Sequence, residues 1–315
     1  MTRVVEVPAS FDDRTFEQFA ASVAAGPLTD KMLFDARGAQ WASPYAFVSM
    51  LAVAQAITDA KGPKPLFTAP EDANVASYWA KAGFFAQAAE LFEIHGKVPK
   101  RKADDESHML LPVTAIRASE DVHEVVDRIH QKAATLLTKE LGLEARATMG
   151  FATALSEACQ NVVEHAGSVG WVAVHAYSYR KRLGKRVVVI AVGDGGVGFR
   201  RSLEPTQAKR IGDRWGDGAA LECALIQGIS RFRDPGRGQG LQGIKRYLAR
   251  WDGKISIRSG GAKLAIVPSW DDEAPLQERL PVFPGAQVQI TIPAQADGRT
   301  GAQADGRTGA QADKS

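Results

Sequence analysis

The segment EACQNVVEHAG, residues 157–167, combines side chains that could bind a cation and move a proton. In a helix of 3.6 residues per turn, a single stripe collects Glu157, Asn161, Glu164 and His165. A solvated helix face would explain this stripe. However, asparagine is a poor helix former, and a carboxylate with an amide one turn away can hold a hydrated divalent cation and activate a water molecule. The segment alone leaves both interpretations open.

The helix that carries this segment is expected over about residues 144–166. Phe151, Leu155, Ala158 and Val162 recur on it at helical spacing, which predicts a buried face. The polar stripe lies on a different face. The helix must therefore pack on a core and still present polar groups elsewhere.

Two glycine-rich segments follow this helix. Asp194 lies in VGDGGVG, after a strand expected at 185–193. The glycines would let a flat ring approach the backbone, and the carboxylate could accept from an exocyclic amine such as that of adenine. The second segment, GRGQGLQG, precedes a helix expected at 241–251, whose first N–H groups can bind an anion. Between them, Phe199–Gly240 holds eight Arg or Lys and five Asp or Glu residues, which favours a basic loop that closes over phosphates.

The same segments contain two G-x-G-x-x-G patterns, which begin at Gly193 and Gly238. A dinucleotide-binding fold needs this pattern between a strand and a helix of one βαβ unit. The first copy leads into FRRSLEPTQAKRI, which does not predict a regular helix, and the second follows a polar segment. We therefore expect neither a dinucleotide-dependent oxidoreductase nor, because GxxxxGK[ST] does not occur, a P-loop site.

Three motifs in this order resemble the N, G1 and G2 boxes of the GHKL ATPases, a superfamily that includes gyrase and the histidine kinases. They are Glu157-xxx-Asn161-xxx-His165, Asp194-x-Gly196-x-Gly198 and Gly238-x-Gly240-Leu241. The form EACQNVVEHA is most similar to the anti-sigma-factor serine kinases. The resemblance spans about residues 109–293 and implies a Bergerat α/β sandwich that binds ATP with Mg²⁺.

The resemblance also implies a role for each motif residue. Glu157 would be the general base, Asn161 the ligand of Mg²⁺, and Asp194 the acceptor for the adenine amine. The other nucleotide-binding residues would be His165, Gly196, Gly198, Arg237, Gly238, Gly240 and Leu241. Gly285-Ala286 stands where the family often has Gly-Thr at the start of its last strand, and Thr291 lies further inside that strand.

The beginning of the chain alternates strand and helix patterns in a βαβαβ order, which predicts a small sheet covered by helices. Strands are expected at 4–8, 31–36 and 65–70, and helices at 16–26, from Ser43-Pro44 onward, and at 74–85. This order resembles STAS domains, the antagonist partners of anti-sigma kinases. Ser43 lies roughly where those antagonists carry their phosphorylated serine, but it is also a good N-cap, so both roles remain open.

The whole sequence predicts an α+β protein in four parts. Residues 1–97 would form the STAS-like α/β domain and 98–108 a polar linker. Residues 109–293 would form the Bergerat α/β sandwich, with a mostly antiparallel sheet that carries helices on one face. The repeat AQADGRTG at 294–315 lacks large apolar side chains, so we expect a disordered tail.

Composition excludes several classes of protein. The chain has 315 residues, 45% of them hydrophobic, and a net charge of only +3. Without a dense Lys/Arg run, we expect no nucleic-acid binding. No apolar run of about 18 residues and no signal-peptide pattern occurs, which favours a cytoplasmic protein without a membrane span. The two cysteines, Cys159 and Cys223, predict neither a disulfide framework nor a metal site.

These predictions combine into a function. We expect a Mg²⁺-dependent ATP-binding regulator, either a serine protein kinase of the anti-sigma-factor type or a slow ATPase, whose partner is a sigma factor, an antagonist or another regulator. A nucleotide sensor without turnover is the alternative, and a homodimer stays open. Residues 1–97 are expected to contact the Phe199–Gly240 segment or the Glu157 helix and to regulate the ATP site.

Overall fold

The computed structural model describes residues 2–100, 109–129, 145–179, 183–229 and 239–294. The expected tail, apart from Ala294, lies outside these residues, as does most of the expected linker. The second half of the helix predicted at 119–142 also lies outside them, and its described part is helical over 119–129.

Residues 2–100, here called the N-terminal module, form a four-stranded parallel sheet. Its order is β1-β3-β5-β6, with bounds Arg3–Glu6, Met32–Asp35, Leu66–Thr68 and Glu93–His95. Two short strands pair in parallel beside it, β2 (Ser10–Phe11) and β4 (Trp41–Ala42). The helices are α1 (Phe16–Ala24), α2 (Pro44–Asp59), α3 (Ala73–Lys81) and α4 (Phe84–Leu91). The parallel βαβαβ arrangement agrees with the sequence prediction, and β6 was missed.

The single helix predicted at 74–85 is two helices in the structure. α3 ends at Lys81 and α4 begins at Phe84. Gly83 between them has a φ of 83°, a left-handed conformation that glycine adopts readily and other residues adopt at a cost. Trp79 of α3 and Phe84 of α4 both pack on the ring of Phe67 in β5, so the turn lets both helices contact the same strand.

Residues 109–294 build a seven-stranded antiparallel sheet, here called the main sheet, in the order β12-β11-β10-β13-β9-β8-β7. In chain order its strands are β7 (Met109–Ile116), β8 (Gly170–Tyr179), β9 (Lys185–Asp194), β10 (Lys254–Gly260), β11 (Ala262–Ile266), β12 (Leu276–Gln277) and β13 (Phe283–Pro293). One face packs on α6 (Ala145–Asn161), on α9 (Gln239–Arg250) and on the helix at 119–129. The large antiparallel sheet with helices agrees with a Bergerat-type α+β domain.

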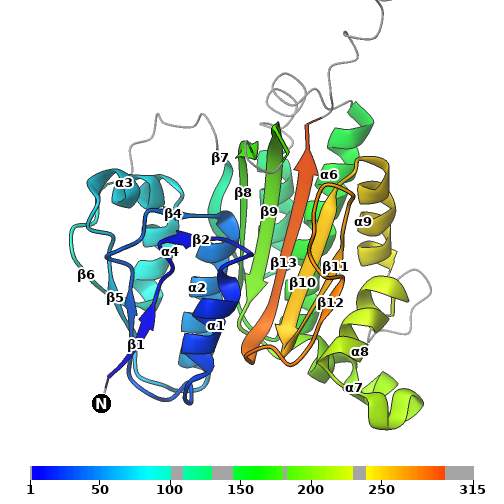
Figure 1. Ribbon diagram of the computed structural model, residues 1–315, viewed down its shortest axis with the longest axis horizontal. Coiled ribbons are helices and arrows are strands. Elements are labelled where there is room, and N and C mark those ends of the chain that lie inside the picture. The colour runs from blue at the N-terminus through cyan, green and yellow to red at the C-terminus, as the bar shows by residue number, and fades with distance from the viewer. Residues whose placement is uncertain (1, 101–108, 130–144, 180–182, 230–238, 295–315) are drawn as a thin grey trace, which may run out of the picture.

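The second face of the main sheet is also covered, by α2 of the N-terminal module (Figure 1). On β9, alternate residues serve different cores, because successive strand side chains point to opposite faces. Val188, Ile190 and Val192 pack with the α6 side, whereas Ala191 belongs to the core of the N-terminal module. Trp171, Ala173 and Phe283 join the same core. The sequence predicted helices on one face of this sheet only; the first hundred residues supply the cover for the other.

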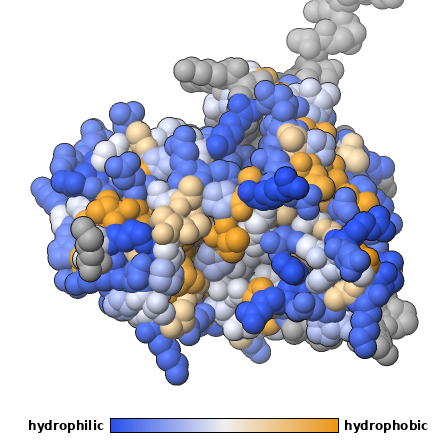
Figure 2. All heavy atoms as spheres, turned by 60° about the horizontal axis from the view of Figure 1, so that its bottom comes forward, coloured by the Kyte–Doolittle hydropathy of each residue, from blue (hydrophilic) through white to orange (hydrophobic). Residues whose placement is uncertain are grey.

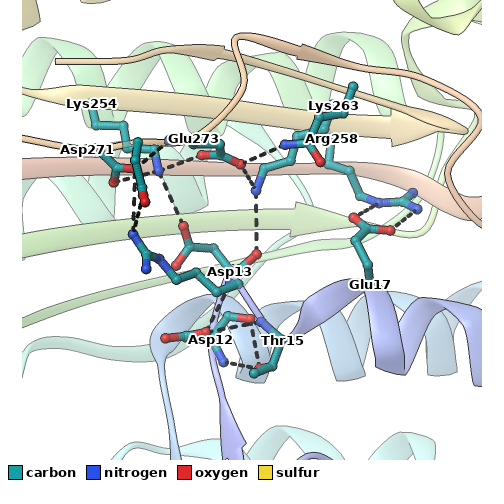
Figure 3. A network of polar contacts seen from close by, with 12 residues as sticks. Asp12, Asp13, Thr15, Glu17, Lys254, Arg258, Lys263, Asp271 and Glu273 are labelled. Carbon is teal, nitrogen blue, oxygen red and sulfur yellow. Dashed lines mark hydrogen bonds and ion pairs between the residues drawn. The ribbon is translucent and has the colours of Figure 1, made fainter. Parts of the chain in front are cut away.

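Charged and polar side chains lie buried between the N-terminal module and the β10–β11 end of the main sheet (Figure 3). Lys254 Nζ lies 3.0 Å from Asp271 Oδ2 and 3.6 Å from Asp13 Oδ2. Glu273 pairs with both Lys254 and Lys263. Burial works to lower the pKa of Lys254, but the carboxylates of Asp13 and Glu273 outweigh it and raise this pKa above its ordinary value. Buried charges are tolerated when they are paired in this way.

Arg258 makes a second buried ion pair between the two halves of the chain. Its guanidinium donates from Nε and Nη2 to the two carboxylate oxygens of Glu17, each at 3.1 Å. It also lies over the rings of Phe16 and Phe283, 5.2 and 5.6 Å from their centroids. Arg258 is fully buried, so the N-terminal module and the main sheet depend on each other for this charge.

The segment after β9 begins with a helix, although its sequence FRRSLEPTQAKRI did not predict a regular one. α7 spans Gly198–Ile211 with Pro205 inside it, followed by a 3₁₀ turn at Gly212–Arg214, α8 (Asp217–Leu221) and a π turn at Glu222–Ile226. Pro205 removes one helical hydrogen bond. The first G-x-G-x-x-G therefore does join a strand to a helix, contrary to the prediction. A dinucleotide fold is nevertheless excluded for this segment, because both neighbours of β9 are antiparallel.

Hydrophobic residues on the face shown in Figure 2 form small groups among hydrophilic side chains. Such scattered exposure is normal for a folded protein. None of the described helices has the length and apolar content that a membrane-spanning helix needs.

Candidate functional site

A cavity of about 630 Å³ lies on the α6 side of the main sheet. α6, α7 and α9 form its walls, and β9 and β13 form its floor. Its polar and charged lining side chains are Thr153, Ser156, Glu157, Gln160, Asn161, Glu164, His165, Asp194, Ser202 and Arg246. A volume of this size is typical of small-molecule sites, which hold roughly 300–1,000 Å³.

α6 presents its polar stripe to this cavity. Glu157, Asn161, Glu164 and His165 are all half-buried and all line it, so the stripe is not a solvated face. The apolar stripe is buried as predicted, with Phe151 and the other three apolar residues at 4% exposure or less. The same helix therefore packs on the hydrophobic core with one stripe and lines the cavity with another.

The helix changes form at the motif itself. α6 ends at Asn161, and a π turn over Val162–Ala166 follows before Gly167 ends the helix at a φ of 65°. π turns are rare and often occur at functional sites, because the extra residue re-aims the side chains around it. Gln160 Nε2 donates to Glu164 Oε1 at 3.0 Å, and His165 Nε2 lies 4.0 Å from Glu164 Oε2. The sequence predicted a continuous helix to residue 166 and did not indicate this turn.

Glu157 lies where a carboxylate is harder to ionise. Burial raises its pKa above the ordinary value, and the nearby carboxylate of Glu164 raises it further. A carboxylate with a raised pKa is a stronger base once ionised. The environment of Glu157 therefore fits a group that accepts a proton.

Asp194 ends β9 on the floor of the cavity and is only 5% exposed. Its Oδ1 accepts a hydrogen bond from the backbone N–H of Gly196 at 2.9 Å. Burial raises the pKa of Asp194 to about 6, and backbone N–H groups of Gly196 and Ala286 partly offset this effect. A buried carboxylate held in place by backbone donors is a well-positioned acceptor for a ligand N–H group.

The loop after Asp194 is pressed against the end of the α6 motif. Val197 N–H donates to the carbonyl of Ala166 at 3.0 Å. A side chain at Gly196 would put its Cβ 2.0 Å from that same carbonyl oxygen, so only glycine fits. Asp194 and Asn161 thus come from strand and helix segments that are joined directly next to the cavity.

The structure brings most of the predicted site residues together. Glu157, Asn161, His165, Asp194, Gly198 and Leu241 line the cavity, and Gly196 holds Asp194. Gly240 lies in the first turn of α9. Arg237 and Gly238 lie outside the described residues. The binding and catalytic roles of these residues stay predictions.

Other predicted residues lie away from the cavity lining. Thr291 is buried but faces the N-terminal side of the main sheet, on the same alternation as Gln287 and Gln289. Ala286 lines the cavity and Thr291 does not, so Thr291 does not take the place of a threonine at position 286. Ser43 is 1% exposed, and its Oγ accepts from the N–H of Ala46 at 3.2 Å as the N-cap of α2.

Several lining residues were not predicted. Phe199, Ser202 and Leu203 reach the cavity from α7, which the sequence did not predict as a helix. Arg246 reaches it from α9. The apolar spacing of α9 predicts its buried face, but no pattern in the sequence indicates which polar residue of the helix meets the cavity.

These residues fit an adenine nucleotide with Mg²⁺. Asp194 offers the buried acceptor that an exocyclic amine needs, and the half-buried Asn161 and Glu157 offer oxygen atoms in the same cavity. Mg²⁺ usually binds through one or two protein oxygens together with phosphate and water oxygens. Among the described residues, no group of three or more His, Cys, Asp or Glu side chains could hold a metal ion without such help.

Fold and site together define an α/β sandwich with a nucleotide-sized cavity between its helices and its sheet. Residues 147–296 match the family model of the histidine kinase-, DNA gyrase B- and HSP90-like ATPases. This part of the chain is therefore a GHKL-type domain, which indicates an ATP-binding ATPase or kinase. The match covers 150 residues, from 147 to 296, out of 315 and does not include the N-terminal module or β7. A comparison with curated proteins finds no match to this chain.

Proposed function

We propose that the protein is a Mg²⁺-dependent ATP-binding regulator that transfers the γ-phosphoryl group of ATP, either to a serine of a protein partner or slowly to water. One observation carries this proposal. Glu157, Asn161 and Asp194, from two elements far apart in the sequence, line a single cavity within a GHKL-type domain.

Each of these residues has a proposed role that follows from its position in the cavity. Asp194 would accept the adenine amine and fix the base at the floor of the cavity. Asn161 would hold the cation, which when bound neutralises charge on the phosphates. Glu157 would accept the proton of the attacking hydroxyl, as the raised pKa of its carboxylate favours. Arg246 lines the cavity from α9 and would contribute a cation to bind the phosphates.

The anti-sigma-factor subtype is part of this proposal and rests on the form EACQNVVEHA. The partner would be a sigma factor, an antagonist or another regulator, bound by the protein as a monomer or a homodimer. We further propose that the N-terminal module is STAS-like and regulates the ATP site, which its parallel βαβαβ sheet supports. Among the described residues, its most extensive contacts with the rest of the chain run to the main sheet. A contact with the Phe199–Gly240 segment or with the Glu157 helix stays a prediction.

Ser43 is a weaker part of the proposal. Its hydroxyl is buried and caps α2, so phosphorylation in the folded protein requires the first turn of that helix to open. The cap alone explains the residue, since an N-cap serine stabilises a helix by about 1 kcal/mol.

Radiolabelled ATP incubated with the purified protein, alone and with cell lysate, tests the reaction. Label on a protein indicates a kinase, and free phosphate alone indicates an ATPase. Glu157→Gln is expected to bind ATP nearly as wild type does but to turn it over about 10²–10⁴-fold more slowly, whereas Asn161→Ala should lose Mg²⁺-dependent binding as well.

The same experiment distinguishes an enzyme that transfers phosphate from the alternative, a nucleotide sensor without turnover. Binding of ATP with equal background turnover in wild type and Glu157→Gln would favour the sensor. Failure of the wild-type protein to bind ATP in calorimetry would refute both forms of the proposal.

A further inference from the structure

We propose that α2 of the N-terminal module positions the carboxylate of Asp194 by packing against the loop that follows it, on the side away from the cavity. Gly195, Ala52 and Ala56 are the positioning residues of this contact. The inference rests on the proposed ATP site. It specifies how the N-terminal module reaches that site: through the back of the Asp194 loop on the far side of the main sheet from the cavity.

The contact at Gly195 is too close for any side chain. A Cβ at Gly195 would lie 2.3 Å from the carbonyl oxygen of Ala52, 3.0 Å from the backbone nitrogen of Ala56 and 3.2 Å from its Cβ. Real Cβ atoms do not approach backbone atoms within 3.0 Å, so either α2 or the loop would have to move. The backbone of α2 therefore lies directly against the residue that follows Asp194.

This contact explains a residue that the motif leaves unspecified. In Asp194-x-Gly196-x-Gly198 the first variable position is Gly195. Gly196 is needed on the cavity side, against the carbonyl of Ala166, whereas Gly195 is needed on the opposite side, against α2. The two glycines thus let the loop fit between the α6 motif and the N-terminal module.

Two further contacts hold α2 in register with the loop. A Cβ atom at Gly193 would lie 3.1 Å from Cγ2 of Val48, which is one turn before Ala52 in α2. At the end of α2, Asp59 Oδ2 accepts a hydrogen bond from Ser168 Oγ at 2.6 Å, just after the π turn of the α6 motif. The helix therefore contacts the strand before Asp194, the loop after it and the segment that follows His165.

Packed backbone contacts transmit displacement, because protein interiors have low compressibility. A shift of α2 toward or away from Gly195 would move Asp194 relative to the cavity. Misplacement by about 1 Å can change a site's performance by about 10²-fold. By linkage, a nucleotide that fixes Asp194 must in turn stabilise one position of α2.

The test compares ATP with purine riboside triphosphate, which lacks the 6-amino group that Asp194 would bind. Gly195→Ala in the full chain is expected to weaken ATP on the order of tenfold and to bring the ratio of the two affinities toward one. Loosening of the fold alone would weaken both nucleotides by the same factor. Asp194→Asn is the positive control, and Gly38→Ala, where a Cβ meets nothing within 4 Å, is the matched control.

Hydrogen exchange supplies a second measurement that needs no variant. ATP with Mg²⁺ should slow exchange at residues 194–198 and at 48–59 of α2 together. Protection confined to 194–198, or an unchanged nucleotide ratio in Gly195→Ala, would overturn the proposal. If wild type binds no ATP, the proposed function fails. In that case the contact is tested without nucleotide. Faster exchange in Gly195→Ala than in wild type at both 194–198 and 48–59 would support the contact, and faster exchange at only one of these segments would refute it.

Discussion

Acidification should lower the free energy of unfolding through one residue, His175 on β8, which lies at the junction between the N-terminal module and the main sheet. Its side chain is 2% exposed and packs near the rings of Phe47 and Tyr78, each with its centroid 6.4 Å away. Its Nδ1 lies 3.5 Å from the Tyr78 hydroxyl, and among the described residues nothing hydrogen-bonds its Nε2. Burial lowers the pKa of His175 from 6.5 to about 3.

The sign and size of the effect follow from proton binding. Between pH 6.5 and pH 3 the unfolded chain binds a proton at His175 that the folded protein does not, so stability falls as the pH falls. The loss is absent above pH 6.5 and grows by about 1.4 kcal/mol for each unit below it. At pH 5.5 the folded protein should therefore be less stable by about 1.4 kcal/mol than at pH 7.5 on account of this residue alone.

Urea unfolding of wild type and His175→Leu at pH 7.5 and pH 5.5 measures this loss. Other titrating groups contribute equally to both proteins, so the difference between the two pH dependences isolates His175. We expect wild type to lose about 1.4 kcal/mol more than His175→Leu over this interval. Equal losses would show that His175 is hydrated or paired in solution and would refute the reasoning.

Three further outcomes are expected. Asp194→Asn should weaken ATP binding by about 1–3 kcal/mol in calorimetry. Because burial raises the pKa of Asp194 to about 6, wild-type affinity should also fall as the pH drops below that value, and the variant should not share this dependence. Arg258→Leu should lower the free energy of unfolding by about 3 kcal/mol, because it removes a fully buried partner of Glu17, whereas loss of the exposed cation in Arg117→Leu should cost less than about 1 kcal/mol. Deletion of 295–315, which keeps the backbone hydrogen bond of Ala294 to Arg186, should leave both Tm and ATP affinity unchanged, and a fall of several degrees in Tm would contradict this.

The junction between the two halves of the chain also bears on how regulation could work. The sequence suggested a domain tethered by a polar linker, and that division of the chain stays a prediction. In the described residues, α2 shares a hydrophobic core with β8, β9 and β13, and buried ion pairs lie beside it. Regulation through this junction would consist of small shifts within a packed interface rather than docking and release.

The sequence by itself determined the local features of the site. The apolar and polar stripes of α6 follow from helical periodicity, and both lie where that periodicity puts them. The strand before Asp194 follows from its run of β-branched residues. Such features depend on residues within one or two turns of each other, so a sequence pattern contains them.

Only the tertiary structure decided what covers the second face of the main sheet. Lys254 and Arg258 alternate with Ile255 and Ile257, a pattern typical of a strand with one solvated face. They are buried instead, because Asp13 and Glu17, some 240 residues away in the chain, bring carboxylates to them. The sequence likewise gives no reason why residue 195 must be glycine, and the structure supplies one, because the backbone of α2 lies against it. Contacts between distant segments depend on where folding places them, and no local spacing encodes that.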